Sequence, residues 1–207
     1  MKIEYLGHSC FLLTTAQGTR LVTDPYTGVG YEMSPVCADY VTCSHFHFDH
    51  AYTDAVQGVK KVISASGKYV CDDIQIEGFD SFHDDVKGAK RGKNVIFVYQ
   101  VEGKRICHMG DQGEVPSPEL IAKLGKIDVL LLPVGGTYTI DAAGAMETIR
   151  RVSPGMAVAM HFRCKDCTLD IASADKLIAL AGDLSERVGS EIPLDRQGKI
   201  LIPARKI

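Results

Sequence analysis

Residues 43–50, Cys-Ser-His-Phe-His-Phe-Asp-His, constrain the fold of this chain more than any other stretch. They place three imidazoles and one carboxylate within six positions, directly after a run of β-branched and aromatic residues that predicts a strand. If the chain leaves that strand extended, His45 and His47 point to the same side and can bind one metal ion. We expect the chain then to turn into a short helix near Ala51, so that Asp49 and His50 diverge and suit a second ion. Imidazole nitrogen and carboxylate oxygen are ligands for zinc, iron or manganese.

The other histidines extend this pattern to distant parts of the chain. Of the seven histidines, five follow or end a predicted strand: His8, His45, His83, His108 and His161. None lies on the polar face of a predicted helix. Because strand ends meet along one edge of a β-sandwich, we expect these residues to converge there.

Strands dominate the first half of the chain, and strands alternate with helices in the second. The pattern predicts strands at 2–6, 11–15, 20–24, 39–44, 60–65, 74–79, 95–101, 105–108, 127–132, 156–160 and 198–202. It predicts helices at 118–124, 141–152 and 173–181, with Asp141 as an N-cap, and a loop at 25–38 that forms a wall or lid. This order indicates an α+β fold with two sheets packed face to face and helices outside.

The pattern His-x-His-x-Asp-His after a hydrophobic strand resembles the signature of the metallo-β-lactamase superfamily. Further blocks resemble the small, stand-alone branch that includes the ascorbate-phosphate lactonases. These blocks are Leu6–Phe11, Thr23–Pro25, His108–Asp111, Pro133–Thr139 and Met160–Phe162. The resemblance therefore covers most of the chain. It implies a four-layer αββα sandwich of two mixed sheets, and we expect one domain over residues 1–207.

The resemblance also implies a set of ligands, of which spacing alone identifies only the four in the 45–50 stretch. The first ion would be bound by His45, His47 and His83, the second by Asp49, His50 and His161, and Asp111 would bridge both. We expect two divalent ions, with zinc as first choice and manganese or iron as alternatives. Asp49 is the residue expected to orient the attacking hydroxide and accept its proton.

Several residues are candidates to support the ligands or contact a substrate. Asp24 could hold a metal-bound imidazole, or simply begin a turn. His8 and His108 could line the site or pack as hydrogen-bonded structural residues. Arg91, in the basic loop 87–93, could bind an anionic substrate or be solvated. Backbone N–H groups at Gly136 and Thr137 could bind an anion, and Arg163 is a further candidate that could equally be a surface residue.

Together these features predict a hydrolase. Two bound ions would activate a bridging water to attack an ester, lactone or phosphoester of a small, anionic molecule. No Gly-x-Ser-x-Gly motif offers a serine nucleophile instead. The alternatives left open are a non-catalytic metal-binding or regulatory module, a di-iron redox protein and an RNA-processing nuclease. A small-molecule substrate is the expected partner, and a homo-oligomer is compatible with the sequence.

Composition and charge limit the cellular location and the binding partners that we expect for this protein. A formal charge of −3 gives no long-range attraction for nucleic acid or an anionic membrane, so we expect neither as a partner. We find no apolar signal segment and expect a cytoplasmic location. The seven cysteines are an odd number in mostly apolar surroundings, which favours reduced thiols. Cys164 and Cys167 form one C-x-x-C pair with no second pair to complete a zinc ribbon.

Overall fold

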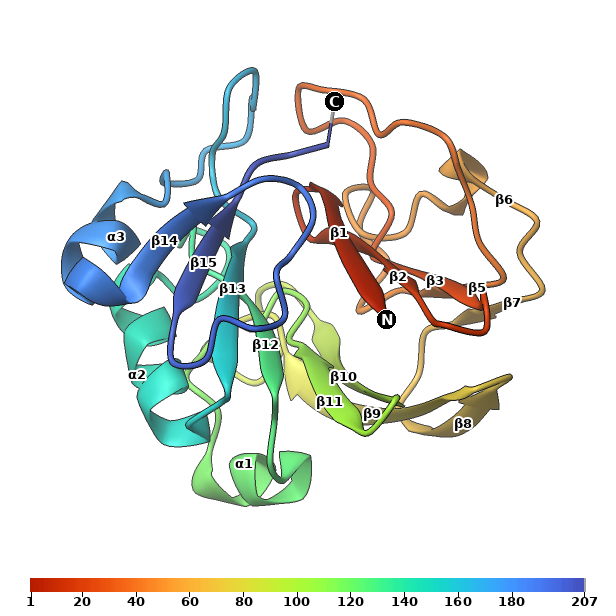
Figure 1. The fold of residues 1–207 in the computed structure, drawn as a ribbon. Helices are drawn as coiled ribbons and strands as arrows, with labels where there is room; N and C mark the ends of the chain where they lie inside the picture. Colours follow the sequence, from red (N-terminus) through yellow and green to blue (C-terminus); the bar gives the residue numbers. More distant parts are fainter. Residues whose placement is uncertain (207) are drawn as a thin grey trace.

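The computed structural model describes residues 1–206, and two β-sheets make up its centre (Figure 1). The first sheet has the strand order β1-β2-β3-β5-β7. Its strands are β1 (Lys2–Gly7), β2 (Cys10–Thr14), β3 (Arg20–Thr23), β5 (Tyr40–Thr42) and β7 (Lys61–Ile63). The first three pair antiparallel, whereas β3, β5 and β7 pair parallel, so the sheet is mixed.

The second sheet is larger and also mixed. Its order is β14-β15-β13-β12-β11-β10-β9-β8. The strands are β8 (Gly67–Cys71), β9 (Ile74–Phe82), β10 (Lys93–Val101), β11 (Lys104–His108), β12 (Val129–Pro133), β13 (Met156–Met160), β14 (Ser185–Val188) and β15 (Ile200–Pro203). Strands β8 to β11 pair antiparallel, and β11 to β15 pair parallel. Two short strands, β4 (Val36–Cys37) and β6 (Val56–Gln57), pair with each other only.

The central strands β10, β12 and β13 of the second sheet are buried on both faces, which explains their nearly continuous apolar sequences. In β10, Phe97 and Tyr99 face the first sheet, where they join a core that includes Phe11 and Leu13. The alternate residues Ile96 and Val98 face the helices. The main core therefore lies between the two sheets, and a second core lies under the helices.

Three α-helices cover the outer face of the second sheet in Figure 1. They are α1 (Pro118–Leu124), α2 (Ala142–Val152) and α3 (Asp175–Ala181). Asp141 N-caps α2, as predicted, by accepting a hydrogen bond of 2.9 Å from the Gly144 amide. The predicted α+β sandwich of two mixed sheets is confirmed. No helix in the described part of the chain is long and apolar enough to cross a membrane.

The outer face of the first sheet carries loop residues rather than α-helices. Tyr26 and Val29 pack there against Val22 and Val41. The short helix expected after the histidine motif is a single 3-10 turn, Thr53–Ala55, because the chain extends at once into β6. A second 3-10 turn, η2 (Gly182–Leu184), follows α3.

The fold brings several strand ends to one edge. Strands β1, β3 and β5 run in the same direction in the first sheet, and β9, β11, β12 and β13 run in the same direction in the second. The residues that follow their carboxyl ends are His8, Asp24, Cys43, His83, Met109, Val134 and His161. The predicted site residues therefore come from both sheets.

Candidate metal centre

The side chains predicted as metal ligands form two adjacent groups. His45, His47 and His83 offer one ligand atom each within 4.8 Å of one another. Asp49, His50 and His161 form the second group, and His8 joins them within the same limit. His47 is exposed, whereas His45, His50, His83 and His161 are buried.

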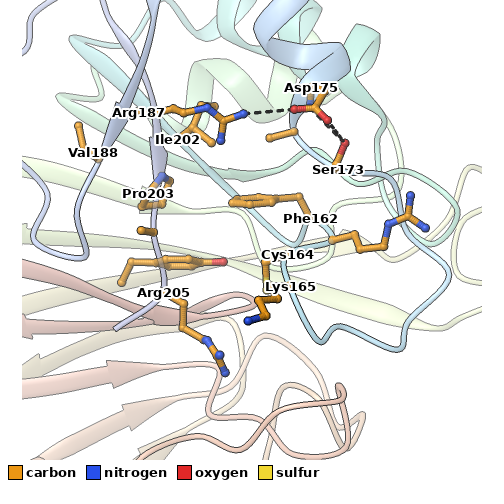
Figure 2. A pocket seen from close by; sticks show the side chains of 14 residues that line it. Phe162, Cys164, Lys165, Ser173, Asp175, Arg187, Val188, Ile202, Pro203 and Arg205 are labelled. Carbon is orange, nitrogen blue, oxygen red and sulfur yellow. Dashed lines mark hydrogen bonds and ion pairs between the residues drawn. The ribbon is translucent and has the colours of Figure 1, made fainter. Parts of the chain in front are cut away.

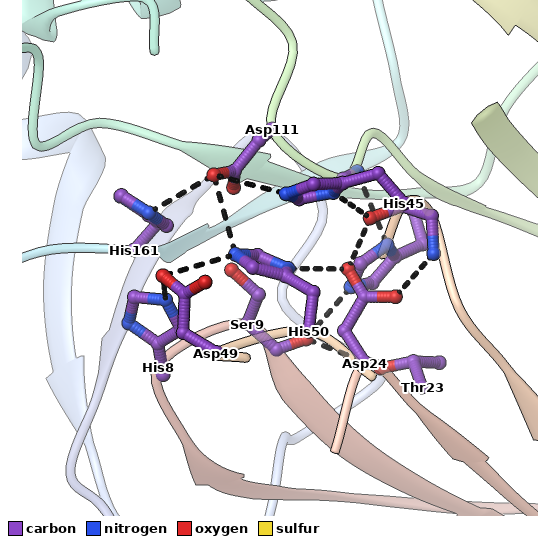
Figure 3. A network of polar contacts seen from close by, with 12 residues as sticks. His8, Ser9, Thr23, Asp24, His45, Asp49, His50, Asp111 and His161 are labelled. Atoms are coloured by element: carbon purple, nitrogen blue, oxygen red, sulfur yellow. Dashed lines mark hydrogen bonds and ion pairs between the residues drawn. The ribbon is translucent and has the colours of Figure 1, made fainter. Parts of the chain in front are cut away.

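Asp111 lies between the two groups (Figure 3). Its Oδ2 atom is 3.2 Å from the Nε2 atoms of His50, His83 and His161, and 4.0 Å from that of His45. One carboxylate thus reaches histidines of both groups, which is the position predicted for a bridging ligand. Asn94, absent from the sequence predictions, fixes this part of the chain, since its Oδ1 accepts from the Asp111 amide (3.0 Å) and its Nδ2 donates to the Met109 carbonyl (2.9 Å).

Asp24 holds the histidine motif in place from below. Its Oδ2 accepts hydrogen bonds from Nδ1 of His50 (2.8 Å) and from the hydroxyl of Ser44 (2.6 Å), while Oδ1 accepts from the Ser44 amide (2.7 Å). The Ser44 hydroxyl donates its only hydrogen to Asp24, so its oxygen accepts a hydrogen bond from Nδ1 of His45 (3.0 Å). Because Nδ1 donates in both residues, Nε2 is the ring nitrogen that His45 and His50 present to a metal ion.

His83 is oriented by a backbone carbonyl. Its Nδ1 donates to the Tyr138 carbonyl at 3.1 Å. Tyr138 reaches this position through a turn in which Gly136 and Thr137 both have positive φ (65° and 58°). The Gly136 amide donates to the Ile140 carbonyl (3.3 Å), so it is not available to an anion as the sequence suggested. The turn instead serves to position Tyr138.

Burial and charge set the protonation of the cluster. Burial, together with the neighbouring His50, lowers the pKa of His45 to about 3, so its imidazole is neutral at pH 7 and suits a metal ion. Burial would raise the pKa of Asp111, but His161 and His50 hold it well below its usual range. For His50, burial acts to lower the pKa, but Asp111 and Asp24 outweigh it and raise the pKa well above its ordinary value. The cluster thus attracts positive charge.

The residues present fit divalent metal ions. Nε2 atoms of His45, His50 and His161 are buried without a hydrogen-bond partner, as is Oδ1 of Asp111. Buried polar atoms normally find partners, so a cluster of unpartnered ones needs an explanation. Two ligand atoms on one ion with bonds of about 2.1 Å lie about 3.0 to 3.4 Å apart. The 3.2 Å contacts of Asp111 lie in that range.

His108 is separate from this cluster in function, although it is close in sequence. Its Nε2 donates to the Ser9 carbonyl at 2.8 Å, and its Nδ1 accepts from the Gly110 amide at 3.1 Å. Both ring nitrogens are therefore satisfied by backbone groups. These contacts match the hypothesis that His108 is a hydrogen-bonded structural residue, and not the alternative that it lines the site.

A cavity of about 300 Å³ opens over the two groups. Its lining residues are His47, Phe48, Asp49, His83, Arg91, Asp111, Tyr138, His161 and Leu169. Arg91 donates from Nη2 to the Thr137 carbonyl (3.1 Å), and its guanidinium lies 5.5 Å from the centre of the Tyr138 ring. Loop 25–38 does not line this cavity, although the Thr27 amide donates to the Phe48 carbonyl (3.2 Å) behind it.

Arg163 lies elsewhere. It lines a separate cavity of about 500 Å³, shown in Figure 2, together with Phe162, Cys164, Arg187 and Arg205. It is not among the residues that line the cavity over the metal ligands. Cys164 and Cys167 are half-buried free thiols.

Comparison with known proteins places this geometry in context. A family model described as a β-lactamase superfamily domain matches residues 2–161. A UPF0173 metal-dependent hydrolase of Carboxydothermus hydrogenoformans is 27% identical over 236 residues, covering 98% of this chain and 100% of the relative. A UPF0173 protein of Pyrococcus furiosus is 30% identical over 186 residues, covering 78% of this chain and 83% of the relative.

A solved structure is similar over the whole chain. It is a candidate Zn-dependent hydrolase of the metallo-β-lactamase superfamily from Thermotoga maritima. The two chains share 34% sequence identity with a TM-score of 0.83, and the match covers 99% of each.

Proposed function

Because this chain belongs to the β-lactamase superfamily, as its match over residues 2–161 shows, we propose that it is a hydrolase with two divalent metal ions. The observation that carries this proposal is the carboxylate of Asp111, with Oδ2 3.2 Å from histidines of both ligand groups. The metal-dependent hydrolase of Carboxydothermus hydrogenoformans supports it as a relative. Zinc is the first choice of metal, since the ligands are imidazoles and carboxylates.

We assign His45, His47 and His83 to the first ion, Asp49, His50 and His161 to the second, and Asp111 to both. When bound, such ions supply hydroxide near neutral pH and polarise the carbonyl or phosphoryl group under attack. Asp24 and Ser44 keep His50 and His45 in the tautomers that this assignment needs.

Asp49 is the proposed general base. Its side chain lines the cavity and is 13% exposed, so it can reach a water molecule beside the substrate. Burial would raise its pKa, but the neighbouring imidazoles of His8 and His50 lower it, so the carboxylate is ionised and can accept a proton.

Replacing Asp49 with Asn tests this role. We expect Asp49→Asn to fold and to lose about 10²- to 10⁴-fold of kcat, because the amide cannot accept the proton. Since Asp49 is also an assigned ligand, the metal content of the variant must be measured beside its turnover. A variant that hydrolyses at the normal rate would contradict the assignment.

The cavity suits a small substrate with a negative charge. Arg91 lines it with a guanidinium fixed by the Thr137 carbonyl and the Tyr138 ring. Among residues 1–206, no carboxylate lies within ion-pair distance of this guanidinium, so a carboxylate or phosphate of the substrate can pair with it. Phe48 and Leu169 offer an apolar wall on the same cavity. We infer an ester, lactone or phosphoester with an anionic group.

The experiment is a screen of metal-loaded protein on esters, lactones and phosphodiesters, each as a matched pair with and without an anionic group. We expect turnover of the anionic members. Arg91→Gln should raise their KM by about 10- to 100-fold, since a hydrogen bond to a charged group is lost, and leave the neutral members unchanged. Lys90→Gln is the matched control in the same loop, because Lys90 pairs with Asp85 (3.0 Å).

The same screen separates the remaining alternatives. Protein that binds two equivalents of metal and turns over no compound of any class would favour a non-catalytic metal-binding module. Equal effects of Arg91→Gln on the KM of both members of each pair would contradict the proposed anion contact. This outcome would not contradict the hydrolase assignment.

A further inference from the structure

His8 is a buried histidine that the ligand assignment above leaves without a role. It follows the carboxyl end of β1 and is 0% exposed. Both of its ring nitrogens lack a hydrogen-bond partner. His108, equally buried, has backbone partners for both nitrogens, which is how a structural buried histidine is usually satisfied.

The ring of His8 faces the second ligand group, as Figure 3 shows. Its Nε2 is 3.3 Å from Oδ2 of Asp49. The ring centre lies 4.3 Å from that of His161 and 5.0 Å from that of His50. One ligand atom from each of these four residues lies within 4.8 Å of the others.

The contact between His8 and Asp49 is too poorly directed to count as a hydrogen bond, since Nε2 remains without a partner despite the short distance. Two ligand atoms bound to one ion lie about 3.0 to 3.4 Å apart, and 3.3 Å falls in that range. The spacing is therefore that of two atoms that share a cation.

The backbone holds His8 in this position at a conformational cost. His8 has a positive φ of 52°, which a side chain with a Cβ atom rarely adopts. Its amide donates to the Tyr31 hydroxyl (3.1 Å), and its carbonyl accepts from the Tyr5 hydroxyl (2.9 Å) and the His161 amide (2.8 Å). The last bond ties His8 directly to an assigned ligand. Strain maintained in this way is typical of residues that must present a side chain to a site.

We propose that His8 is a further protein ligand of the second metal ion, beside Asp49, His50, His161 and the shared Asp111. This proposal rests on the proposed function, because it requires that the cluster binds metal. The second ion then has five protein ligands and the first has four. The second ion is consequently the one that the protein holds more tightly, and the first keeps more room for water and substrate.

The direct test is nitrogen NMR of ¹⁵N-labelled protein loaded with ¹¹³Cd, a stand-in for zinc with a nuclear spin. A ring nitrogen bonded to the ion shows a scalar coupling to ¹¹³Cd. We expect coupling for six histidines, including His8, and none for His108, which is the internal control. Coupling in His45, His47, His50, His83 and His161 without His8 would overturn this proposal alone. Absence of any coupling and of bound metal would overturn both this proposal and the proposed function.

A variant adds a second measurement. We expect His8→Gln to bind one ion with unchanged affinity and the other about 10- to 100-fold more weakly in a chelator competition. The unfolding temperature of the metal-free variant shows whether the fold is kept. A folded variant that binds both ions like the wild type would contradict the role of His8.

Discussion

At the scale of single residues, Asp24 is a buried carboxylate that orients a proposed ligand by a hydrogen bond to its imidazole. It is 0% exposed and has a positive φ of 39°. Its Oδ2 accepts two hydrogen bonds, from His50 and from Ser44. The sequence left a ligand support and a simple turn equally open for this residue, and the structure places it directly under the motif.

Asp24→Asn should therefore weaken metal binding. In this variant, the amide nitrogen of the substituted side chain donates hydrogen bonds where one carboxylate oxygen of Asp24 accepted them. It would then face the N–H of His50 or the Ser44 hydroxyl, which are themselves donors, so the His50 imidazole would lose its fixed orientation. We expect metal affinity to fall by about 10- to 100-fold, as measured by competition with a chelator. Asp128→Asn is the control, because Asp128 accepts from the Arg105 amide (2.8 Å) and contacts no ligand. Equal affinities of the two variants would contradict the role of Asp24.

At the scale of elements, one carboxylate organises the loop between β9 and β10. Asp84 accepts hydrogen bonds of 2.7 to 2.9 Å from the amides of Val86, Gly88, Lys90 and Arg91. The loop therefore has a fixed shape although its sequence, rich in lysine and glycine, suggests a solvated turn. This shape places the Arg91 side chain at the cavity that the proposed metal ligands line.

Limited proteolysis tests that organisation, because the loop contains several bonds that trypsin recognises. We expect wild-type protein to resist cleavage between residues 87 and 93, and Asp84→Ala to be cut there much faster, since four amides lose their acceptor. The variant Asp85→Ala, in which an exposed pair with Lys90 is lost, is the matched control. Similar cleavage of both variants would show that Asp84 does not fix the loop.

Most helices and strands could be predicted, because several of the strands alternate apolar and polar residues and most of the helices begin at clear capping residues. The hairpin of β10 and β11 and the helix α1 were predicted within one or two residues. Within the two main sheets, the strands without a predicted counterpart are β8 and β14, which lie at opposite edges of the second sheet. An edge strand pairs on one side only and stays partly exposed, so its apolar pattern is weak.

The site could be predicted only in part from the sequence, because backbone groups without a sequence signal orient its side chains. Spacing indicates the candidate ligands of the 45–50 stretch, and strand ends suggest that distant histidines converge. The contacts that orient them come from groups with no sequence signal, such as the Tyr138 carbonyl that accepts from His83. Tertiary packing determines these contacts. It also determines that His8 lies beside the second ligand group, whereas both ring nitrogens of His108 have backbone partners.

At the scale of the whole molecule, the proposed metal ligands come from both sheets. His45, Asp49 and His50 follow β5 of the first sheet, whereas His83 and His161 follow strands of the second. Bound ions would therefore cross-link the two halves of the sandwich at one edge. Ions that bind only the folded chain stabilise it by mass action, by about 4 kcal/mol at a free concentration of 1,000 times Kd.

Metal removal should consequently lower the stability of the whole sandwich and not only of the site. For a chain of this size, 1 kcal/mol corresponds to roughly 2–4 °C in Tm, so we expect chelator-treated protein to unfold about 8–16 °C below the reloaded protein. Calorimetry of the same sample before chelation, after it and after zinc is restored provides the comparison. Because the core between the two sheets couples them with or without the ions, unfolding should remain one transition in each state. Two separate transitions after chelation would show that the ions, rather than the core, couple the two sheets. Identical Tm values before and after chelation would show that the ions do not stabilise the fold.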